Sequence, residues 1–564
     1  MKKNNGYGVV YTPDALSDFV ATLLVNEFIA DNDSIQPERM LTVLDPACGE
    51  CSLLIAAKKA IDTLSLHDCV NFIGVDIEKE VIETNKQKFN TSNFSFHIFN
   101  SLLPSEKTTA IGYWSKTVKN ISLIIANPPW SSEKIFPKEA LNTAGYAFDV
   151  GQYDSYVLFM ELCLNIIQPN GLLAFIIPDS IFASENQELR KYLAENTELK
   201  VIARLGEKIF PGVNRATTVL IIKKSMPGTT SFTKCFRLNT EQRKRFLAGD
   251  ELLIDAYQKS MHRVEQNRFK KNIGYTFDVD TLQSEEALLN KMEHNSIAWG
   301  ETFHFGRGVE IAKSGLVVVC SECKMAQGYS KQQFLDETKK CSLCGASIQI
   351  SPNVTEKIIE REGASGFEKI YVGENVQRYS MEGSNFIRLG VAGINYKKAK
   401  LYAPPKILIR KTGLGINACI DYASTYTSQT VYSCNYLSEK PDIPLAYYLG
   451  VLNSRIMYYY YLKKYGENEW KSHPYLTKKI LFSFPVPAVK KENRVICEGI
   501  AKLAMELQNE YSRAKDIELE NMTAQLYEID QEEMRLIVAE INRLPNLGAI
   551  NHMKFREDEL CFGI

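Results

Sequence analysis

The chain has 564 residues, of which 45% are hydrophobic and 24% charged, and its formal net charge is -1. This composition excludes a disordered or collagen-like protein, and the length predicts roughly two to four domains. The charge is unevenly distributed, because residues 241–490 carry 34 basic and 26 acidic side chains. Such a basic block is typical of a domain that binds a polyanion, and a merely solvated surface is the alternative.

The sequence also predicts where the protein works. Lys2 and Lys3 are followed by no apolar stretch of signal-peptide length, and no later run is as long as a membrane span. The 13 cysteines are an odd number and, apart from one quartet, are scattered through apolar segments, which indicates reduced thiols. We therefore expect a cytoplasmic protein with no membrane partner.

The N-terminal third predicts a doubly wound α/β domain. A helix begins near Asp14, which can cap it, and places its apolar residues on one face up to Phe28. A strand over 41–45 then passes through small residues into a helix over 52–62. A strand, a small-residue turn and a helix N-terminus form the usual nucleotide cradle of such a sheet.

Polar residues follow each of the first four predicted strands. They are Asp45, Asp76 after the strand 71–75, Asn100 after the strand 94–99, and Asn127. We expect them along the carboxyl edge of one parallel sheet, where open α/β folds bind ligands. Asp76 has the spacing of a carboxylate that binds ribose hydroxyls. Acidic strand ends favour a positively charged nucleoside over a phosphate.

The most informative stretch is Ile121 to Trp130, an apolar run that ends in Asn-Pro-Pro-Trp. Two prolines stop the strand at the sheet edge. Asn127 and the backbone carbonyl of Pro128 offer two acceptors beside the flat face of Trp130. This combination suits the exocyclic amine of a base that has been swung out of a nucleic acid. A strand that ends in prolines and packs a core Trp is the alternative.

The remaining elements of this domain are two helices, over 153–167 and 184–195, and three strands, over 171–177, 201–205 and 217–223. The loop 206–212 carries Phe210, which we expect either over the same strand edge or in the core.

These blocks together resemble the γ-class DNA adenine-N6 methyltransferases, the TaqI-type enzymes of restriction-modification systems. The resemblance covers the first 225 residues, in the family's order, through Tyr11-Thr12-Pro13, Asp45 to Gly49, Gly74 to Ile77, Asn127 to Trp130, Gly171 to Pro178, and Phe210-Pro211. It implies a Rossmann-like class I fold and S-adenosylmethionine as cofactor.

The resemblance also implies the roles of individual residues. Asp45, Pro46, Ala47, Cys48 and Gly49 would lie along the methionine of the cofactor, which Tyr11, Thr12 and Pro13 would cover. Asp76 and Ile77 would bind its ribose, and Asn100 and Ser101 its adenine. Asn127 and Pro128, followed by Pro129, would hold the target N6, with Trp130 and Phe210 on the two sides of the flipped base.

Two positions depart from the family pattern. Cys51 replaces a glycine in the first turn, and Asn100 replaces an aspartate. A side chain at Cys51 is unfavourable if the turn needs positive φ. Asn100 can still accept a hydrogen bond from an adenine amine. We therefore expect weakened rather than lost cofactor binding.

The middle of the chain predicts a metal-binding module. Residues 226–300 are polar, and we interpret them as a helical connector; a second domain then spans 301–489. Within it, Cys320, Cys323, Cys341 and Cys344 form two CxxC pairs. This spacing is typical of a zinc ribbon, here 318–348, in which four thiolates hold a structural Zn²⁺ and leave no open position. Unrelated thiols are the alternative.

Basic residues of the second domain are candidate DNA contacts. They are Lys397, Lys398, Lys400, Arg410, Lys411 and Lys471. Phosphate neutralisation is the functional hypothesis for them, as it is for Lys463 and Lys464. Segments around 404–413, 447–461 and 484–487 resemble the family's C-terminal target-recognition domain. Residues 490–564 end the chain as an acidic helical pair over 492–511 and 518–541.

We predict a site-specific adenine-N6 DNA methyltransferase that acts on duplex DNA. The same pocket chemistry leaves open an RNA or protein-glutamine methyltransferase, and a decayed turn at Cys51 leaves open a catalytically silent DNA-specificity subunit. Pro178-Asp179 and Glu198-Leu-Lys200 imitate a nuclease motif, but they fall within the methyltransferase sheet. Restriction would therefore belong to a separately encoded endonuclease.

Overall fold

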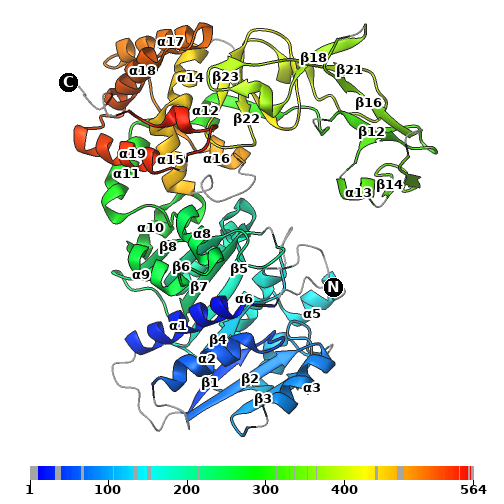
Figure 1. Cartoon of the computed structure of the whole chain (residues 1–564), viewed down its shortest axis with the longest axis vertical. Helices are drawn as coiled ribbons and strands as arrows, with labels where there is room; N and C mark the ends of the chain where they lie inside the picture. The colour runs from blue at the N-terminus through cyan, green and yellow to red at the C-terminus, as the bar shows by residue number, and fades with distance from the viewer. Residues whose placement is uncertain are drawn as a thin grey trace. The chain divides into compact units, whose positions relative to one another are not determined.

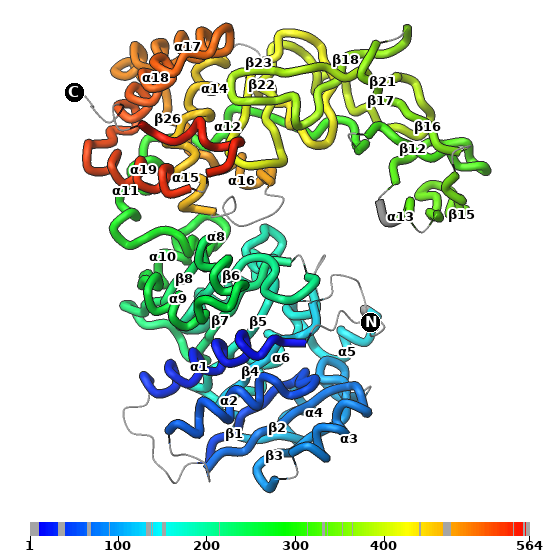
Figure 2. Tube along the Cα trace, viewed as in Figure 1, coloured from blue at the N-terminus to red at the C-terminus, as the bar shows by residue number. Residues whose placement is uncertain are grey.

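The computed structural model describes the chain except for residues 1–10, 32–39, 65–68, 90, 106, 131–136, 149–153, 214, 313, 330, 336, 352–353, 364, 439–441, 466–474, 545, 557–558 and 560–564. The chain forms two compact units. The first contains Met1–Ser284 and Lys463–Ser472, and the second contains Glu285–Leu462 and His473–Ile564. Figures 1 and 2 show the elements of each. None of the helices in the described part is long and apolar enough to cross a membrane.

The first unit is built on a nine-stranded sheet of order β3-β2-β1-β4-β5-β7-β6-β8-β9. Its strands are β1 (Leu41–Asp45), β2 (Val70–Asp76), β3 (Phe94–Ile98), β4 (Leu123–Ala126), β5 (Leu172–Pro178), β6 (Glu198–Gly206), β7 (Thr217–Lys223), β8 (Phe232–Arg237) and β9 (His262–Glu265). The first five are parallel, and β7 runs antiparallel to both β5 and β6. The carboxyl ends of β1 to β4 therefore meet at one edge.

Helices cover both faces of this sheet (Figure 1). They are α1 (Asp14–Ala30), α2 (Ser52–Asp62), α3 (Lys79–Lys88), α4 (Ala110–Thr117), α5 (Lys138–Ala144), α6 (Ser155–Ile166), α7 (Gln187–Asn196), α8 (Thr240–Ala248), α9 (Leu253–Ser260) and α10 (Gln266–Lys271). The cores are separate: α1, α2 and α9 contribute to one, and α4, α6 and α7 to the other. This is the doubly wound α/β arrangement predicted from the sequence.

Two details of the prediction differ from the structure. Asp14 does not cap α1, because Pro13 is the N-cap residue and Asp14 is already the first helical residue. The first unit also continues past residue 225. Strands β8 and β9 extend the same sheet, so residues 226–284 belong to this unit rather than to a connector. Residues 285–300 belong to the second unit.

The nuclease-like pattern is split by the sheet. Pro178 pairs with one end of β7, at Thr217, whereas Glu198 pairs with the other end, at Lys223. Asp179 follows directly on Pro178 and forms an ion pair with Arg204, with 2.5 Å between Oδ2 and Nη2. Its carboxylate and that of Glu198 therefore lie at opposite edges of the sheet and cannot bind one metal ion.

The second unit combines small sheets with helices. Two four-stranded sheets have the orders β11-β25-β22-β23 and β17-β21-β18-β24. Their strands are β11 (Phe303–Arg307), β17 (Ile359–Glu360), β18 (Phe367–Tyr371), β21 (Asn385–Arg388), β22 (Lys406–Arg410), β23 (Ala418–Asp421), β24 (Tyr426–Thr427) and β25 (Val431–Tyr436). Smaller sheets contain β10 (Ser296–Ala298), β12 (Leu316–Val319), β13 (Ala326–Gly328), β14 (Thr338–Lys340), β15 (Ser347–Gln349), β16 (Thr355–Lys357), β19 (Val376–Gln377), β20 (Ser380–Met381) and β26 (Pro485–Pro487).

The helices of this unit are α11 (Glu286–Glu293), α12 (Trp299–Thr302), α13 (Lys331–Leu335), α14 (Leu445–Asn453), α15 (Arg455–Tyr465, of which the residues up to Leu462 belong to this unit), α16 (Lys478–Phe482), α17 (Arg494–Asn509), α18 (Arg513–Leu526) and α19 (Gln531–Arg543). The last three correct the predicted C-terminal pair. The segment 518–541 is not one helix, because the chain turns between α18 and α19 and Glu528 adopts a positive φ of 57°.

Candidate active site

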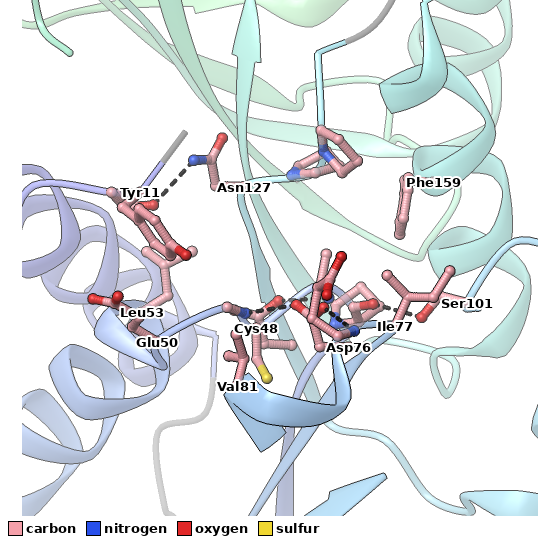
Figure 3. Close-up of a pocket in the computed structure, with 18 of the residues that line it drawn as sticks. Tyr11, Cys48, Glu50, Leu53, Asp76, Ile77, Val81, Ser101, Asn127 and Phe159 are labelled. Atoms are coloured by element: carbon pink, nitrogen blue, oxygen red, sulfur yellow. Dashed lines mark hydrogen bonds between the residues drawn. The ribbon is translucent and has the colours of Figure 1, made fainter. Parts of the chain in front are cut away.

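A cavity opens at the carboxyl edge of β1 to β4 (Figure 3). Asp45, Asp76, Asn100 and Asn127, the four polar residues that follow or end these strands, all line it. Most of the predicted cofactor residues also line it, namely Tyr11, Thr12, Pro46, Ala47, Cys48, Gly49, Ile77 and Ser101, together with Pro128, Pro129 and Trp130. Pro13 is not among the described lining residues. The sequence therefore predicted most of the wall of this cavity.

The turn between β1 and α2 is tied to β2. Gly49 and Cys51 both adopt positive φ, 49° and 67°. The Gly49 amide donates to Asp76 Oδ2 at 2.9 Å, and the Asn85 side chain donates to the Gly49 carbonyl at 2.8 Å. Cys51 therefore does occupy the left-handed conformation that its Cβ disfavours, and its fully buried side chain packs in the core.

Asp45 is a buried carboxylate beside a second acid. It is 1% exposed, and its Oδ1 accepts a hydrogen bond from the Ala47 amide at 3.0 Å. Burial, with a smaller contribution from the charge of Asp76, raises the pKa of Asp45 to about 8. A cationic ligand near Asp45 would reverse this shift, since an opposite charge favours the carboxylate. The wall next to β1 therefore suits a positive group.

Asp76 and Asn100 shape the neighbouring wall. The carboxylate of Asp76 also accepts from the Glu78 amide at 3.0 Å, so each of its oxygens binds one backbone N–H. Asn100 Oδ1 accepts from the amides of Leu102 and Leu103, at 3.0 and 3.2 Å. The Asn100 oxygen that we expected to accept from an adenine amine thus already binds two donors. The amide nitrogen of this side chain is the group better suited to a ligand.

The Asn127 side chain is oriented by Thr12 across the cavity wall. Its Nδ2 donates to Thr12 Oγ1 at 3.0 Å (Figure 3). Because the oxygen and the nitrogen of a side-chain amide point in different directions, this bond directs Oδ1 away from Thr12. The preceding strand β4 is entirely buried, which gives Asn127 a rigid base.

The rings of Trp130 and Phe210 contact each other, and they do not stand on two sides of a space for a base. Their ring centroids are 5.2 Å apart and nearly perpendicular. Trp130 lines the cavity, and its Nε1 donates to the Ile176 carbonyl at 3.3 Å. Phe210 is 1% exposed and is not among the described residues that line the cavity. The structure therefore brings Phe210 behind Trp130 and not onto the opposite side of a bound base.

The four cysteines of the second unit come together as predicted. Cys320–Cys323 joins β12 to β13, Cys341–Cys344 joins β14 to β15, and all four sulfurs lie within 4.8 Å of one another. Sulfur distances of 3.7 Å separate Cys320 from Cys344 and Cys323 from Cys341. The Gln327 side chain donates to Cys341 Sγ at 3.1 Å. This group can hold a metal ion.

The basic residues that we predicted as DNA contacts differ in their exposure and in their partners. Lys397 pairs with Glu310 at 2.7 Å, and Arg410 Nε donates to the Thr412 carbonyl at 2.6 Å. Lys411 lies 5.6 Å from the ring centroid of Tyr475. Lys398 and Lys400 are exposed, and Lys471 lies outside the described residues.

Lys463 and Lys464, by contrast, are nearly buried, and their ammonium groups donate to the Asp280 carbonyl and to Asn272 Oδ1. The sequence interpretation of these two as phosphate contacts is therefore wrong.

Sequence reasoning missed several groups around the cavity. Other lining residues are Glu50, Ser52, Leu53, Glu78, Val81, Phe99, Leu102 and Phe159. A cluster formed by Asp154, Ser155 and Arg215 contacts the loop after β4. Asp154 and Ser155 stand at the predicted start of a helix, where polar residues are usually taken as caps, so nothing in the local sequence marked them as contacts to this loop.

Two family models match the chain. Residues 1–293 match the family described as N-6 DNA methylase, and residues 368–486 match the TaqI-like C-terminal specificity domain. The second match overlaps the sheets formed by β18, β21, β22 and β25.

The individual relatives have low sequence identity to this chain. The type II methyltransferase M.BanIII of Aneurinibacillus aneurinilyticus is 28% identical over 220 residues, which are 37% of this chain and 37% of that protein. The putative type II restriction enzyme and methyltransferase RM.MjaORFECS2P of Methanocaldococcus jannaschii is 22% identical over 449 residues, 76% of this chain and 33% of that protein. The chain spans between 17% and 40% of the length of the first four curated relatives.

Among solved structures, the ATP-dependent Type ISP restriction-modification enzyme LlaBIII bound to DNA is similar over 89% of this chain and 39% of that chain. The TM-score is 0.50 and the sequence identity is 12%. At this level the likeness concerns the fold alone.

Proposed function

This chain belongs to the N-6 DNA methylase family, and on that premise we propose that it transfers a methyl group from S-adenosylmethionine to N6 of an adenine flipped out of duplex DNA. The TaqI-like specificity domain would select the site. Restriction-modification systems are the context in which we place this activity, with any endonuclease on a separate polypeptide.

The cavity walls support the cofactor assignment. Asp45 and Asp76 provide negative charge for a ligand that carries a sulfonium and an ammonium group, and Asp76 can accept ribose hydroxyls in addition to its two backbone donors. Asn100 and Ser101 flank the position proposed for the adenine. When bound, the cofactor supplies an electrophilic methyl group, so the residues of the chain need only bind, orient and exclude water.

The loop after β4 supports the choice of an amine as acceptor. Asn127 and Pro128 both line this cavity, and the Asn127 side-chain oxygen and the Pro128 carbonyl are each hydrogen-bond acceptors. Hydrogen bonds from the amino group to both would pull the nitrogen towards a tetrahedral shape and stabilise the positive charge that develops during attack. Trp130 would stack on the extruded base. Alignment of amine and methyl provides much of the remaining rate.

One observation carries the proposal: the Asn127 amide, fixed by Thr12, and the acidic strand ends Asp45 and Asp76 line the same cavity. We expect Asn127→Ala to reduce transfer of radioactive methyl from the cofactor to duplex DNA by at least about 100-fold, since one preorganised acceptor is lost. Cofactor affinity, measured by calorimetry, should stay within about threefold of the parent because the acidic residues proposed to bind the cofactor, Asp45 and Asp76, belong to β1 and β2 rather than to the loop after β4.

Asn142→Ala provides the matched control, because Asn142 is an exposed residue of α5. Duplex RNA in place of DNA tests the substrate. An Asn127→Ala variant that labels DNA at the parental rate would overturn the proposal, and so would preferential labelling of RNA.

We also propose that the four-cysteine group binds one structural Zn²⁺. Sulfur ligands about 2.3 Å from a tetrahedral zinc ion are about 3.8 Å from one another. The two sulfur distances of 3.7 Å fit that spacing and are far longer than a disulfide bond. In both knuckles the residue after the second cysteine, Lys324 or Gly345, has positive φ, which turns backbone amides towards the sulfurs.

A further inference from the structure

The loop Asn127–Trp130 cannot be held by its own central amides. Pro128 and Pro129 have no N–H, so this segment has no backbone donor between Asn127 and Trp130. Contacts from elsewhere must therefore fix its side chains and carbonyls. Thr12 accepts from the Asn127 side chain, and the Ile176 carbonyl accepts from the Trp130 indole. Two further contacts bind the carbonyls of Pro129 and Trp130.

These two carbonyls are held by adjacent elements. The hydroxyl of Ser155, the first residue of α6, donates to the Pro129 carbonyl. Arg215, in the loop between β6 and β7, donates from Nη1 to the Trp130 carbonyl at 2.9 Å. The carbonyls of the consecutive residues Pro129 and Trp130 are thus bound by two different elements, α6 and the loop between β6 and β7.

Arg215 is itself held by a charge partner. Its Nη2 donates to Asp154 Oδ2 at 3.0 Å, and Asp154 is only 8% exposed. Ser180 donates to the same carboxylate oxygen at 2.8 Å. The guanidinium therefore spans two fixed acceptors, a carboxylate and a peptide carbonyl. Because the guanidinium is planar and uses two of its nitrogens, it fixes the orientation of the Trp130 carbonyl relative to the Asp154 carboxylate as well as the distance between them. A lysine ammonium does not impose such an orientation.

We propose that Arg215 is a positioning residue for methyl transfer, which fixes the Trp130 peptide and thereby the alignment of the base amine with the methyl group. The inference rests on the proposed function, since it assigns Arg215 to that same site. Arg215 is not among the described residues that line the cavity, and its contact with the loop is to the Trp130 carbonyl, so its proposed effect passes through Trp130. A displacement of about 1 Å in such a site can lower the rate about 100-fold.

The test compares Arg215→Met and Arg215→Lys with the parent in the full chain. Single-turnover methylation of duplex DNA with tritiated S-adenosylmethionine gives the rate, and calorimetry gives the cofactor affinity. We expect Arg215→Met to lower the rate about 10- to 100-fold while cofactor affinity changes less than twofold. Arg215→Lys should recover part of the loss, because lysine can bind one of the two acceptors. A purely structural arginine would change the rate and the cofactor affinity together.

Arg263→Met is the control, since Arg263 is an exposed arginine of the same unit that stacks on Phe232, and it should behave as the parent. Asp154→Asn provides a second route to the same result. It should slow transfer in the same sense, and the double variant should be no slower than Arg215→Met alone. Additive effects would overturn the inference.

Failure of this inference is distinguishable from failure of the proposed function. A parent that neither binds the cofactor nor labels DNA overturns both. An active parent with an Arg215→Met variant of equal rate, or one whose loss is entirely in cofactor affinity, overturns the role of Arg215 alone.

Discussion

At the scale of single residues, the buried carboxyl group of Asp45 lowers the stability of the folded chain at neutral and higher pH. Its carboxyl group keeps its proton up to a pH of about 8 in the folded chain, because burial raises its pKa. In the unfolded chain it ionises near pH 4. Between these values the folded state binds more protons than the unfolded state, so the contribution of Asp45 to stability falls as pH rises from about 4 to about 8.

We therefore expect Asp45→Asn to stabilise the protein while it loses cofactor binding. The substitution keeps an acceptor for the Ala47 amide and removes the ionisation. The free energy of unfolding should rise by roughly 2 to 4 kcal/mol at pH 8 and by much less at pH 5. Denaturant unfolding at the two pH values measures the gain. Asp255→Asn, at an exposed position of α9, is the control and should show no pH-dependent gain.

The same shift predicts proton release on cofactor binding. A cationic ligand lowers the pKa of Asp45, so affinity should increase as pH rises towards about 8. Calorimetry in two buffers with different ionisation enthalpies counts the protons released. Equal heats in both buffers at pH 7 would contradict this account of Asp45.

Single residues also mark the limit of prediction from sequence. The strand-end positions of Asp45, Asp76 and Asn127 follow from apolar runs that end in a polar residue, and all three line the cavity. Phe210 illustrates the opposite case. Its burial against Trp130 depends on the direction of a side chain in a loop, which neighbours far away in the sequence determine.

At the scale of elements, most strands of the large sheet were predictable from apolar runs flanked by breakers, but β8 and β9 were not. Strands β1 and β7 have the predicted bounds or contain them, because they are short, apolar and clearly terminated. Strands β8 and β9 were missed, since charged residues such as Lys234 and Arg263 alternate with buried ones in them. These are the last two strands on one side of the sheet, with β8 parallel to β6 and antiparallel to β9. Their mixture of charged and apolar residues gives them a composition that resembles that of a connector.

The proposed zinc site makes a prediction at this scale. We expect about one equivalent of zinc per chain by elemental analysis, and its loss in Cys323→Ser. Four-cysteine modules of this size depend on the metal for folding, so protease cleavage within 316–350 should increase severalfold. Cofactor affinity should not change, since the four cysteines belong to the second unit.

Cys69→Ser, at a half-buried cysteine outside the quartet, serves as control and should retain zinc. Full zinc content in both variants would show that the quartet is not the binding site.

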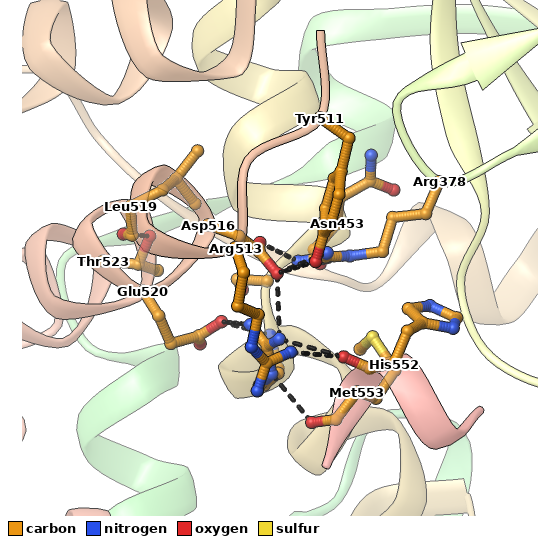
Figure 4. Close-up of polar contacts among 12 residues, drawn as sticks. Arg378, Asn453, Tyr511, Arg513, Asp516, Leu519, Glu520, Thr523, His552 and Met553 are labelled. Carbon is orange, nitrogen blue, oxygen red and sulfur yellow. Dashed lines mark hydrogen bonds and ion pairs between the residues drawn. The ribbon is translucent and has the colours of Figure 1, made fainter. Parts of the chain in front are cut away.

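At the scale of the whole molecule, the C-terminal helices are part of the second unit rather than an appendix. Asp516 of α18 is fully buried and accepts hydrogen bonds from Arg378 (Figure 4). It also accepts a hydrogen bond from Arg455 of α15. Glu520 binds Arg455 and the backbone at the start of α15. The sequence showed an acidic helical end but not its partners, because these basic residues lie 61 and 138 positions away from Asp516.

This network predicts that Asp516→Asn weakens the second unit without affecting the cofactor site. Although burial opposes its ionisation, Arg378 and Arg455 hold the pKa of Asp516 below its usual value, so the pair contributes stability at neutral pH that is lost in acid. Removal of the Asp516 charge leaves the buried Arg378 without its carboxylate partner and leaves Arg455 paired with Glu520 alone. This should lower the free energy of unfolding by about 3 to 5 kcal/mol. Calorimetric unfolding measures this loss, and Glu518→Gln, an exposed acid of the same helix, should cost less than about 0.5 kcal/mol.

Cofactor affinity of the Asp516→Asn variant should stay within about twofold of the parent, because Asp45 and Asp76 belong to the other unit. An equal loss of stability in both variants would mean that the charge network does not hold these helices in place.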